Sequence, residues 1–396
     1  MREAAVRTLP DRPTLEHLRH QANDLLAGLR GSNPAATLAD AQAWLAEQYG
    51  FRSWTELKTE VDRRADAADV ADPAVAQAIA DRFDLGDVVE PMRSVARSDE
   101  IGRPWSLRTT RGRWWVRSLE NWWPIVDVET EVGLQSAAGR AGICLPAPVR
   151  SRTGAIVEQI GEKRWRVNEW RHSGPPLTAP ASAETTRLVG AILATLHGLA
   201  RPVDRISPWF HHRRSSDSWA DLAARAKAAG APWAADLAAA ITTLADLDRI
   251  GGDGPDPEPV LTHTVLGPAQ VRRGTGGRLI VTGWEHAGGL PPAWELADAL
   301  MHWAVDPDGQ VNVPAARGLV EGYARTASSV PAVGLAAFRG AVTSLANYVH
   351  EQVELALSAT DADDRRFRER SVRHLLAHLP TTSTVEHLSA VVARAA

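Results

Sequence analysis

The chain has 396 residues, of which 44% are hydrophobic and 23% charged, with a formal net charge of -4 and a pI near 6.4. This length accommodates two or three domains, and this balance is typical of a globular protein rather than a disordered one. The weakly acidic charge and the lack of a basic stripe argue against a nucleic-acid partner. The single cysteine, Cys144, cannot form a disulfide within the chain. Neither a signal-peptide pattern nor a run of roughly 18–20 apolar residues is present, so we expect a cytoplasmic protein without a membrane partner.

The beginning of the chain predicts three short helices. The first follows Thr14 as an N-cap, the second is expected over 38–49, and the third begins after Ser53. The patterns L-R-H-Q-A-N-D-L-L and Y-G-F-R-S-W resemble a small module that precedes assorted bacterial domains and has no chemistry attached to it. We predict a three-helix module at 1–64 that packs on the rest of the chain or contacts a protein partner. An Ala- and Asp-rich linker is expected at 65–78.

Short strands and turn signals dominate the next segment. Runs containing Trp and Val, separated by T-R-G, predict a hairpin over 105–119, and a second strand pair is expected over 156–170. A weaker strand signal lies at 92–97. One helix is expected over 128–141, where a glycine and two prolines end it. These elements predict a lobe of five strands and one helix at 79–172.

The remainder of the chain, 173–396, is rich in helical patterns. One hairpin at 260–286 interrupts them. Strands that come first, with helices segregated after them, indicate an α+β fold.

The most informative motif lies in this hairpin. Residues 263–270 read H-T-V-L-G-P-A-Q, and 281–285 read V-T-G-W-E. Protein kinases and their small-molecule relatives carry H-x-D-x-x-x-x-N and then, one short hairpin later, a metal-binding Asp. The chain resembles the aminoglycoside phosphotransferase family, in which the two motifs read H-G-D-L-x-P-x-N and I-D-W-E. At the family's catalytic Asp, metal-binding Asn and second metal-binding Asp the chain has Val265, Gln270 and Gly283.

The resemblance covers residues from about 79 to 390. It implies a protein-kinase-like two-lobe fold, with a five-stranded N-lobe and a helical C-lobe, preceded by the small helical module. A-T-L-H ending at His197 and W-E-L-A containing Glu295 resemble family motifs with structural roles, and Glu295 is expected to brace the catalytic loop.

Other motifs of the resemblance lie in the N-lobe. W-V-R ending at Arg117 takes the place of A-V-K, whose Lys holds the nucleotide phosphates and pairs with a helix Glu. The partner here is expected to be Glu131, or else Glu129, and the Arg117–Glu131 pair could persist as a purely structural contact. Ser98 takes a glycine position of the phosphate loop. V-N-E-W at 167–170 resembles the linker between the lobes, whose backbone binds adenine.

These replacements imply a cleft that has lost phosphoryl transfer. Val265 cannot accept a proton, and Gly283 offers no oxygen to Mg²⁺. We therefore expect no resident metal or cofactor, and ATP with magnesium only if the chain is a divergent phosphotransferase. The ionisable groups left as catalytic candidates are His263, Glu285 and His286. The candidate ligand-binding residues are Arg117, Glu131, Glu169, Trp170, Gln270 and Trp284.

Three functions stay open at this point. The first is a pseudokinase that binds a small organic ligand without turnover. The second is a repurposed enzyme that performs acid–base chemistry on a natural product, and the third is a divergent ATP-dependent small-molecule phosphotransferase. The 15 Trp, against 5 Phe and 3 Tyr, favour an organic ligand, because flat apolar side chains suit such molecules. Whether the chain is an enzyme remains undecided.

Overall fold

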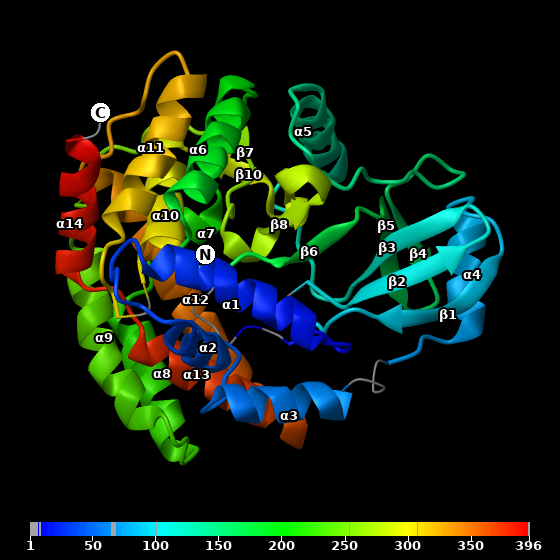
Figure 1. Ribbon diagram of the computed structural model, residues 1–396, viewed down its shortest axis with the longest axis horizontal. Coiled ribbons are helices and arrows are strands. Elements are labelled where there is room, and N and C mark those ends of the chain that lie inside the picture. The colour runs from blue at the N-terminus through cyan, green and yellow to red at the C-terminus, as the bar shows by residue number, and fades with distance from the viewer. Residues whose placement is uncertain are drawn as a thin grey trace.

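A strand-rich lobe and a helical lobe lie side by side, and three N-terminal helices lie against the helical lobe (Figure 1). The computed structural model describes Arg7 and residues 9–64, 69–99, 101–252, 254–306 and 308–394. The predicted protein-kinase-like α+β fold is confirmed. Among the described helices, none combines the length and the apolar character needed to cross a membrane.

The N-lobe is built on one antiparallel sheet with the strand order β1-β2-β3-β5-β4. All five predicted strands are present, and the weakly indicated one begins earlier than expected, at Val88. Their bounds are β1 Val88–Ser94, β2 Pro104–Thr109, β3 Gly112–Leu119, β4 Val157–Ile160 and β5 Lys163–Glu169. The predicted helix is α5 Val128–Arg140, which Asp127 caps through the N–H of Thr130.

The two faces of this sheet have different roles. Successive side chains of a strand point to opposite faces, so Val116 and Trp114 share one face while Trp115 and Arg117 share the other. Val116 and Trp114 pack in the core beneath helix α4, whereas Trp115 and Arg117 line the cleft. The alternation of β3 therefore aims one Trp of the doublet, and the arginine, at the site.

Helix α4, Pro73–Arg82, covers the apolar face of the sheet. Residues 73–78 had been assigned to a linker, and this part of the prediction was wrong. Asp72 caps the helix by accepting the N–H of Ala74, and Pro73 takes the first helical position, where a missing N–H costs nothing. The other domain bounds, 1–64, 79–172 and 173–396, stay predictions.

The C-lobe is helical. Its helices pack around one large core, and α6 and α11 approach so closely that a Cβ atom on Gly190 would lie 1.9 Å from the carbonyl oxygen of Leu319. The bounds are α6 Ala183–Gly198, α7 Pro208–His211, α8 Ser216–Ala228, α9 Ala234–Asp248, α10 Pro292–Ala304, α11 Val313–Thr326, α12 Arg339–Ser358, α13 Ala362–Ala377 and α14 Thr382–Ala393, with a 3-10 turn, η4, at Leu335–Phe338.

The predicted hairpin at 260–286 is more elaborate than one strand pair. β7 Val260–Thr262 pairs with β10 Gly288–Leu290, while β8 Val271–Gly274 pairs with β9 Leu279–Val281 and with β6 Ser173–Pro176. Three short 3-10 turns complete the segment, namely η1 Pro268–Gln270, η2 Thr275–Gly277 and η3 Trp284–His286. The two motifs of the resemblance thus lie in loops that strands anchor at both ends.

The N-terminal helices are α1 Leu15–Leu29, α2 Leu38–Gln48 and α3 Trp54–Arg64. They share a small core of their own, and Thr14 caps α1 as predicted. Two of their side chains bind backbone carbonyls at the start of the C-lobe. Gln21 donates to the carbonyl of Pro176 at 3.1 Å, and Gln48 donates to that of Ala179 at 3.3 Å. The helices therefore dock on the mouth of the cleft.

Candidate ligand-binding cleft

A cleft of about 1660 Å³ opens between the lobes, and both lobes and the N-terminal segment contribute to its walls. Five of the six predicted ligand-binding residues line it, namely Arg117, Glu169, Trp170, Gln270 and Trp284. Of the three predicted catalytic residues, Glu285 and His286 line it. His263 and Glu131 are buried behind the surface of the cleft.

The loop that carries the H-T-V-L motif is firmly braced. Thr264 adopts φ +66, a left-handed conformation in which the family's glycine would be unstrained. Its N–H donates to Oε1 of Glu295 at 2.8 Å, and its hydroxyl donates to the carbonyl of His286 at 2.8 Å. The other carboxylate oxygen of Glu295 lies 2.7 Å from Nε2 of His197, whose Nδ1 bonds Tyr323 at 2.8 Å. Glu295 thus holds the loop in shape, in the role predicted for it.

His263 has a structural setting. Its ring is fully buried, its Nε2 lies 2.8 Å from the carbonyl of Thr282, and its edge contacts Trp284 at 4.9 Å between ring centres. Burial lowers the pKa of His263, although the bond to Thr282 opposes the shift. Because a carbonyl only accepts, Nε2 of the neutral ring donates. His263 therefore joins the two motif loops and does not reach the cleft.

Val265 and Gly283 take the positions that the resemblance assigns to the family's catalytic and metal-binding Asp residues. Val265 is 6% exposed and packs in the C-lobe core, away from the cleft. Gly283 has φ +80, and a Cβ atom on it would lie 2.3 Å from Oε1 of Gln270. The longer side chain of Gln270 therefore lies where the family's metal-binding Asp would project. An Asp at 283 would have to displace Gln270.

Asp99 binds backbone N–H groups of the loop that the resemblance aligns with the family's phosphate loop. The carboxylate of Asp99 accepts the N–H of Ile101 at 3.0 Å and that of Gly102 at 3.1 Å, and it also pairs with Arg117. Backbone N–H groups and a cation at this position are what a phosphate would bind. Asp99 occupies these donors with a negative charge of its own.

The predicted Arg117–Glu131 pair is wrong, because both residues have other partners. Arg117 pairs with Asp99, and Glu131 is held by Arg166 through two bonds of 2.7 and 2.9 Å. The Arg166 and Glu131 side chains are 1% and 3% exposed. Arg117 and Arg166 are register partners on β3 and β5, and Arg166 is the one directed at α5. The alternative partner, Glu129, pairs with Arg150 at 2.7 Å.

Arg117 and Arg166 both act electrostatically on Glu285. Burial opposes its ionisation, but the guanidinium groups of Arg117 and Arg166 outweigh burial and hold the pKa of Glu285 below its ordinary value. In turn, burial disfavours the charge of Arg166, and the carboxylates of Glu131 and Glu285 outweigh it and raise the Arg166 pKa. The interior of the cleft therefore carries a network of ionised groups at neutral pH.

His286 is neutral under the same conditions. Burial lowers the pKa of His286 to about 4, against an opposing attraction from Glu285. Arg117 adds to the lowering by repulsion. A histidine with this pKa holds almost no proton near pH 7.

An aromatic and cationic stack lines the wall next to the linker. The rings of Trp115 and Trp170 lie 5.8 Å apart, and Arg113 lies 3.7 Å above Trp170. Arg272 lies 5.9 Å from Trp115 on the C-lobe side. The N–H of Glu169 in the linker is already bonded to the carbonyl of Ala147 at 2.8 Å. The four side chains of the stack line the cleft beside the linker between the lobes.

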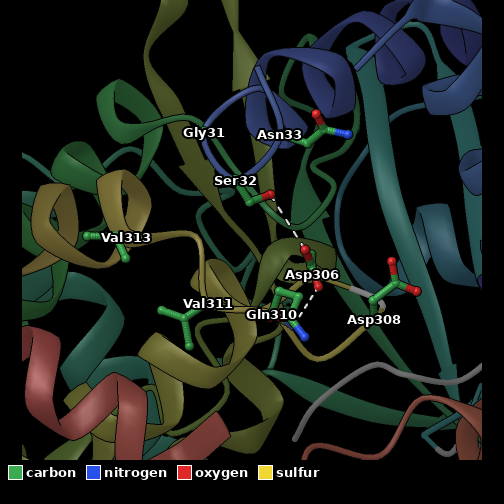
Figure 2. Close-up of a pocket in the computed structure, with 8 residues that line it drawn as sticks. All are labelled: Gly31, Ser32, Asn33, Asp306, Asp308, Gln310, Val311 and Val313. Carbon is green, nitrogen blue, oxygen red and sulfur yellow. Dashed lines mark hydrogen bonds between the residues drawn. The ribbon is translucent and has the colours of Figure 1, made fainter. Parts of the chain in front are cut away.

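A second, smaller cavity lies between the loop after α1 and the loop after α10 (Figure 2). Asp306 projects into it, with Ser32 Oγ at 3.5 Å and the N–H of Gln310 at 2.6 Å (Figure 2). The first contact joins the two loops, and the second lies within the loop after α10. This cavity is part of the docking of the N-terminal helices and lies apart from the cleft.

Comparison with known families settles the lineage. Residues 94–328, more than half of the chain, match the model of the phosphotransferase enzyme family, APH. The chain belongs to this family.

Relatives and solved structures agree with this assignment. A homoserine kinase of Methylorubrum populi is 27% identical over 271 residues, which is 67% of this chain and 79% of that protein. The spectinomycin phosphotransferase APH(9)-Ia, solved with ADP and spectinomycin, superposes with a TM-score of 0.52 at 12% identity, covering 80% of this chain and 97% of that one. An amicoumacin kinase solved with AMP-PNP and Ca²⁺ gives a TM-score of 0.50 at 14% identity, with coverages of 81% and 96%. At such identities the two structures show the shared fold alone.

The residues that the sequence did not single out are Asp99 and Arg166. Asp99 directly follows Ser98 in the sequence, and no motif of the resemblance marks it. Arg166 shares with Arg117 the strand face that turns from the α4 core. A search for charged residues at alternate positions of adjacent strands would have found Arg166.

The Arg166–Glu131 pair yields a first prediction. In Arg166→Met the carboxylate of Glu131 stays buried without its guanidinium partner, so the free energy of unfolding should fall by about 3–5 kcal/mol. The control is Arg150→Met, which breaks the exposed pair of the same helix and should cost less than ~1 kcal/mol. Urea denaturation of the two variants gives the comparison. Equal losses would contradict the role of the buried pair.

The low pKa of His286 yields a second prediction. The unfolded chain takes up a proton near the ordinary histidine pKa of 6.5, but the folded chain does so only near 4. The contribution of His286 to the free energy of unfolding is therefore fully present above pH 6.5. It is lost as the pH falls toward 4, which lowers the free energy of unfolding by up to ~3 kcal/mol. His286→Gln should remove this part of the pH dependence. Denaturation curves between pH 7.5 and pH 4 check it, and parallel curves for wild type and variant would refute it.

Proposed function

We propose that this member of the phosphotransferase family binds a small organic ligand in its cleft and does not transfer phosphoryl groups from ATP. The observation that carries the proposal is the position of Gln270, whose carboxamide lies over Gly283 in the space of a metal ligand. Two further contacts point the same way. Asp99 accepts the N–H groups of Ile101 and Gly102, and Trp115 packs on Trp170 in the wall of the cleft.

The metal position is the first argument. Magnesium prefers hard oxygen ligands in near-octahedral order, and carboxylates supply most of its protein ligands. Gly283 has no side-chain oxygen, and Val265 packs in the core instead of facing a substrate hydroxyl. The amide oxygen of Gln270 is neutral and binds a divalent cation more weakly than a carboxylate. Of the two side chains that the resemblance assigns to magnesium, an Asn and an Asp, the carboxylate is therefore absent and the amide stands on a longer side chain.

The phosphate position is the second argument. A triphosphate approaching the loop after β1 would meet the carboxylate of Asp99, which repels it at short range. It would also compete with Asp99 for Arg117 and for two backbone N–H groups. Binding of ATP then requires the loop to give up three existing interactions.

The charge of the cleft indicates the class of ligand. Among the described residues that line it, thirteen are arginines and nine are Asp or Glu, so the walls favour an anion. The Trp115–Trp170 pair, with Arg113 on its outer side, offers stacking to a flat ring. We infer that the ligand is an organic acid with an aromatic or other planar part.

The state of His286 favours binding over repurposed acid–base catalysis. A general acid or base works best when its pKa lies near the operating pH. His286, with a pKa of about 4, cannot donate a proton at neutral pH and is a weak base there. Glu285 is ionised under the influence of Arg117 and Arg166 and is a weak base as well. Their arrangement suits the recognition of a ligand better than proton transfer.

The similarity to a homoserine kinase supports the alternative of a divergent phosphotransferase. That reading requires Gln270 to hold magnesium on its own and Asp99 to leave Arg117 when ATP enters. It differs from our proposal in one measurable respect, which is the consumption of ATP.

A turnover assay decides between the two. The chain, incubated with ATP, Mg²⁺ and homoserine, should release no ADP above the rate without protein. The Methylorubrum populi homoserine kinase under the same conditions is the positive control. ADP release that depends on homoserine would overturn the proposal, as would ADP release with water as the acceptor.

Ligand binding is tested with a planar aromatic anion, 8-anilinonaphthalene-1-sulfonate, followed by its fluorescence. Trp170→Leu and Arg113→Gln should each weaken binding roughly tenfold, because they remove the stacking wall. Trp44→Leu, in the N-terminal helices, is the control and should leave binding unchanged. Unaltered melting temperatures exclude unfolding as the cause. Equal binding by all four proteins would contradict the proposed ligand site.

A further inference from the structure

We propose that Glu47, His374 and His378 form a zinc site that joins the N-terminal helices to the C-lobe. Glu47 lies near the end of α2, His374 lies in the last turn of α13, and His378 directly follows that helix. None of the three lines the cleft or takes part in the arguments above.

The ligand atoms are already close together. One atom from each of the three side chains lies within 4.8 Å of the others. Ligands on a tetrahedral zinc ion, bound at 2.0–2.2 Å, are roughly 3.3 Å apart. Small rotations of the side chains close this difference, and the exposed Glu47 carboxylate has room to make them.

The two histidines are arranged as a chelating pair. Residues four apart on a helix share a face, and the two rings lie 4.3 Å apart between centres. Nδ1 of His378 lies 2.7 Å from the carbonyl oxygen of His374. Because that carbonyl only accepts, Nδ1 donates this hydrogen bond, which leaves Nε2 as the ring nitrogen that can bind a metal ion. Nε2 lies 3.6 Å from Oε1 of Glu47, so it faces the carboxylate ligand.

A carbonyl bonded to the far nitrogen is the usual outer partner of a metal-binding histidine, since it fixes both the tautomer and the ring orientation. Two imidazoles with one carboxylate suit Zn²⁺, and a water molecule completes the tetrahedron. The partial exposure of His378, with 16% of its side chain accessible, allows an ion to enter from solvent.

The site would act as a clamp between parts of the chain that are far apart in sequence. Next to Glu47, Gln48 already donates to the carbonyl of Ala179 in the C-lobe, and Glu47 itself lies 3.6 Å from His378 at the end of α13. A metal ion that binds only the docked arrangement stabilises it by mass action. Zinc should therefore tie the N-terminal helices more firmly to the C-lobe.

The test uses the full chain after removal of metals with EDTA. Calorimetry with ZnCl₂ should give one site per chain, and His374→Ala, His378→Ala and Glu47→Gln should each weaken it at least about tenfold. His387→Ala, on the exposed face of the neighbouring helix α14, is the matched control and should bind as wild type does. Cobalt(II) in place of zinc should give the intense visible bands of a four-coordinate site.

Thermal melting adds a second readout. Zinc should raise the melting temperature of wild type and of His387→Ala and leave that of Glu47→Gln unchanged. Glu47 is exposed, so its substitution by Gln keeps the fold even where a histidine variant fails to fold. Absence of zinc binding by wild type would overturn the proposal. The proposal would also be overturned if Glu47→Gln and His378→Ala both bound zinc as tightly as wild type does.

Discussion

The buried guanidinium of Arg166 is the interaction on which the electrostatics of the cleft depend. It joins three elements, because it lies on β5, binds Glu131 of α5 through two bonds, and acts on Glu285 of the C-lobe. In this fold the strand lysine would hold both the helix glutamate and the phosphates. Here Arg166 binds the helix glutamate, Glu131, and Arg117 pairs with Asp99 instead. A change of partner at one arginine thus rearranges both the helix and the phosphate loop.

A buried set of hydrogen bonds supports the loop that carries the H-T-V-L motif. Glu295, His197 and Tyr323 form a buried chain of bonds that ends on the N–H of Thr264. These hydrogen bonds support the backbone of the loop and do not involve the side chain at position 265. A valine at 265 can therefore turn into the core without disturbing the loop. Similarly, Gln270 can extend over Gly283 because glycine leaves the space free. The side chains at positions 265, 270 and 283 are therefore compatible with each other and with the loop that carries them.

Much of the fold could be predicted from the sequence, because strand alternation, helix caps and turn residues are local signals. The five strands of the N-lobe and the helix at Val128–Arg140 follow from such signals. The helix at Pro73–Arg82 was missed, because its alanines and the neighbouring Asp residues are typical of a linker as well. The pairing of β7 with β10 was also missed, since it joins strands on either side of the hairpin.

Most of the residues at the site could be predicted from the sequence, but the partner of each charged residue could not. The residues that line the cleft came from motifs, which record chain position. Which arginine meets Glu131 depends on the registration of β3 against β5 and on the distance to α5, and no motif records these. The same holds for Asp99, whose carboxylate reaches the loop N–H groups only when the loop folds back.

The central claim is that the chain's own side chains occupy the nucleotide subsites. It is tested most directly by calorimetric titration of ATP with magnesium into wild type and into a variant that combines Asp99→Gly, Trp115→Ala and Gln270→Ala. The account predicts no binding by wild type at millimolar nucleotide and measurable binding by the variant, in which the three side chains no longer fill the subsites. Binding by wild type as tight as that of the variant would contradict it, and so would a variant that is folded and still binds no nucleotide.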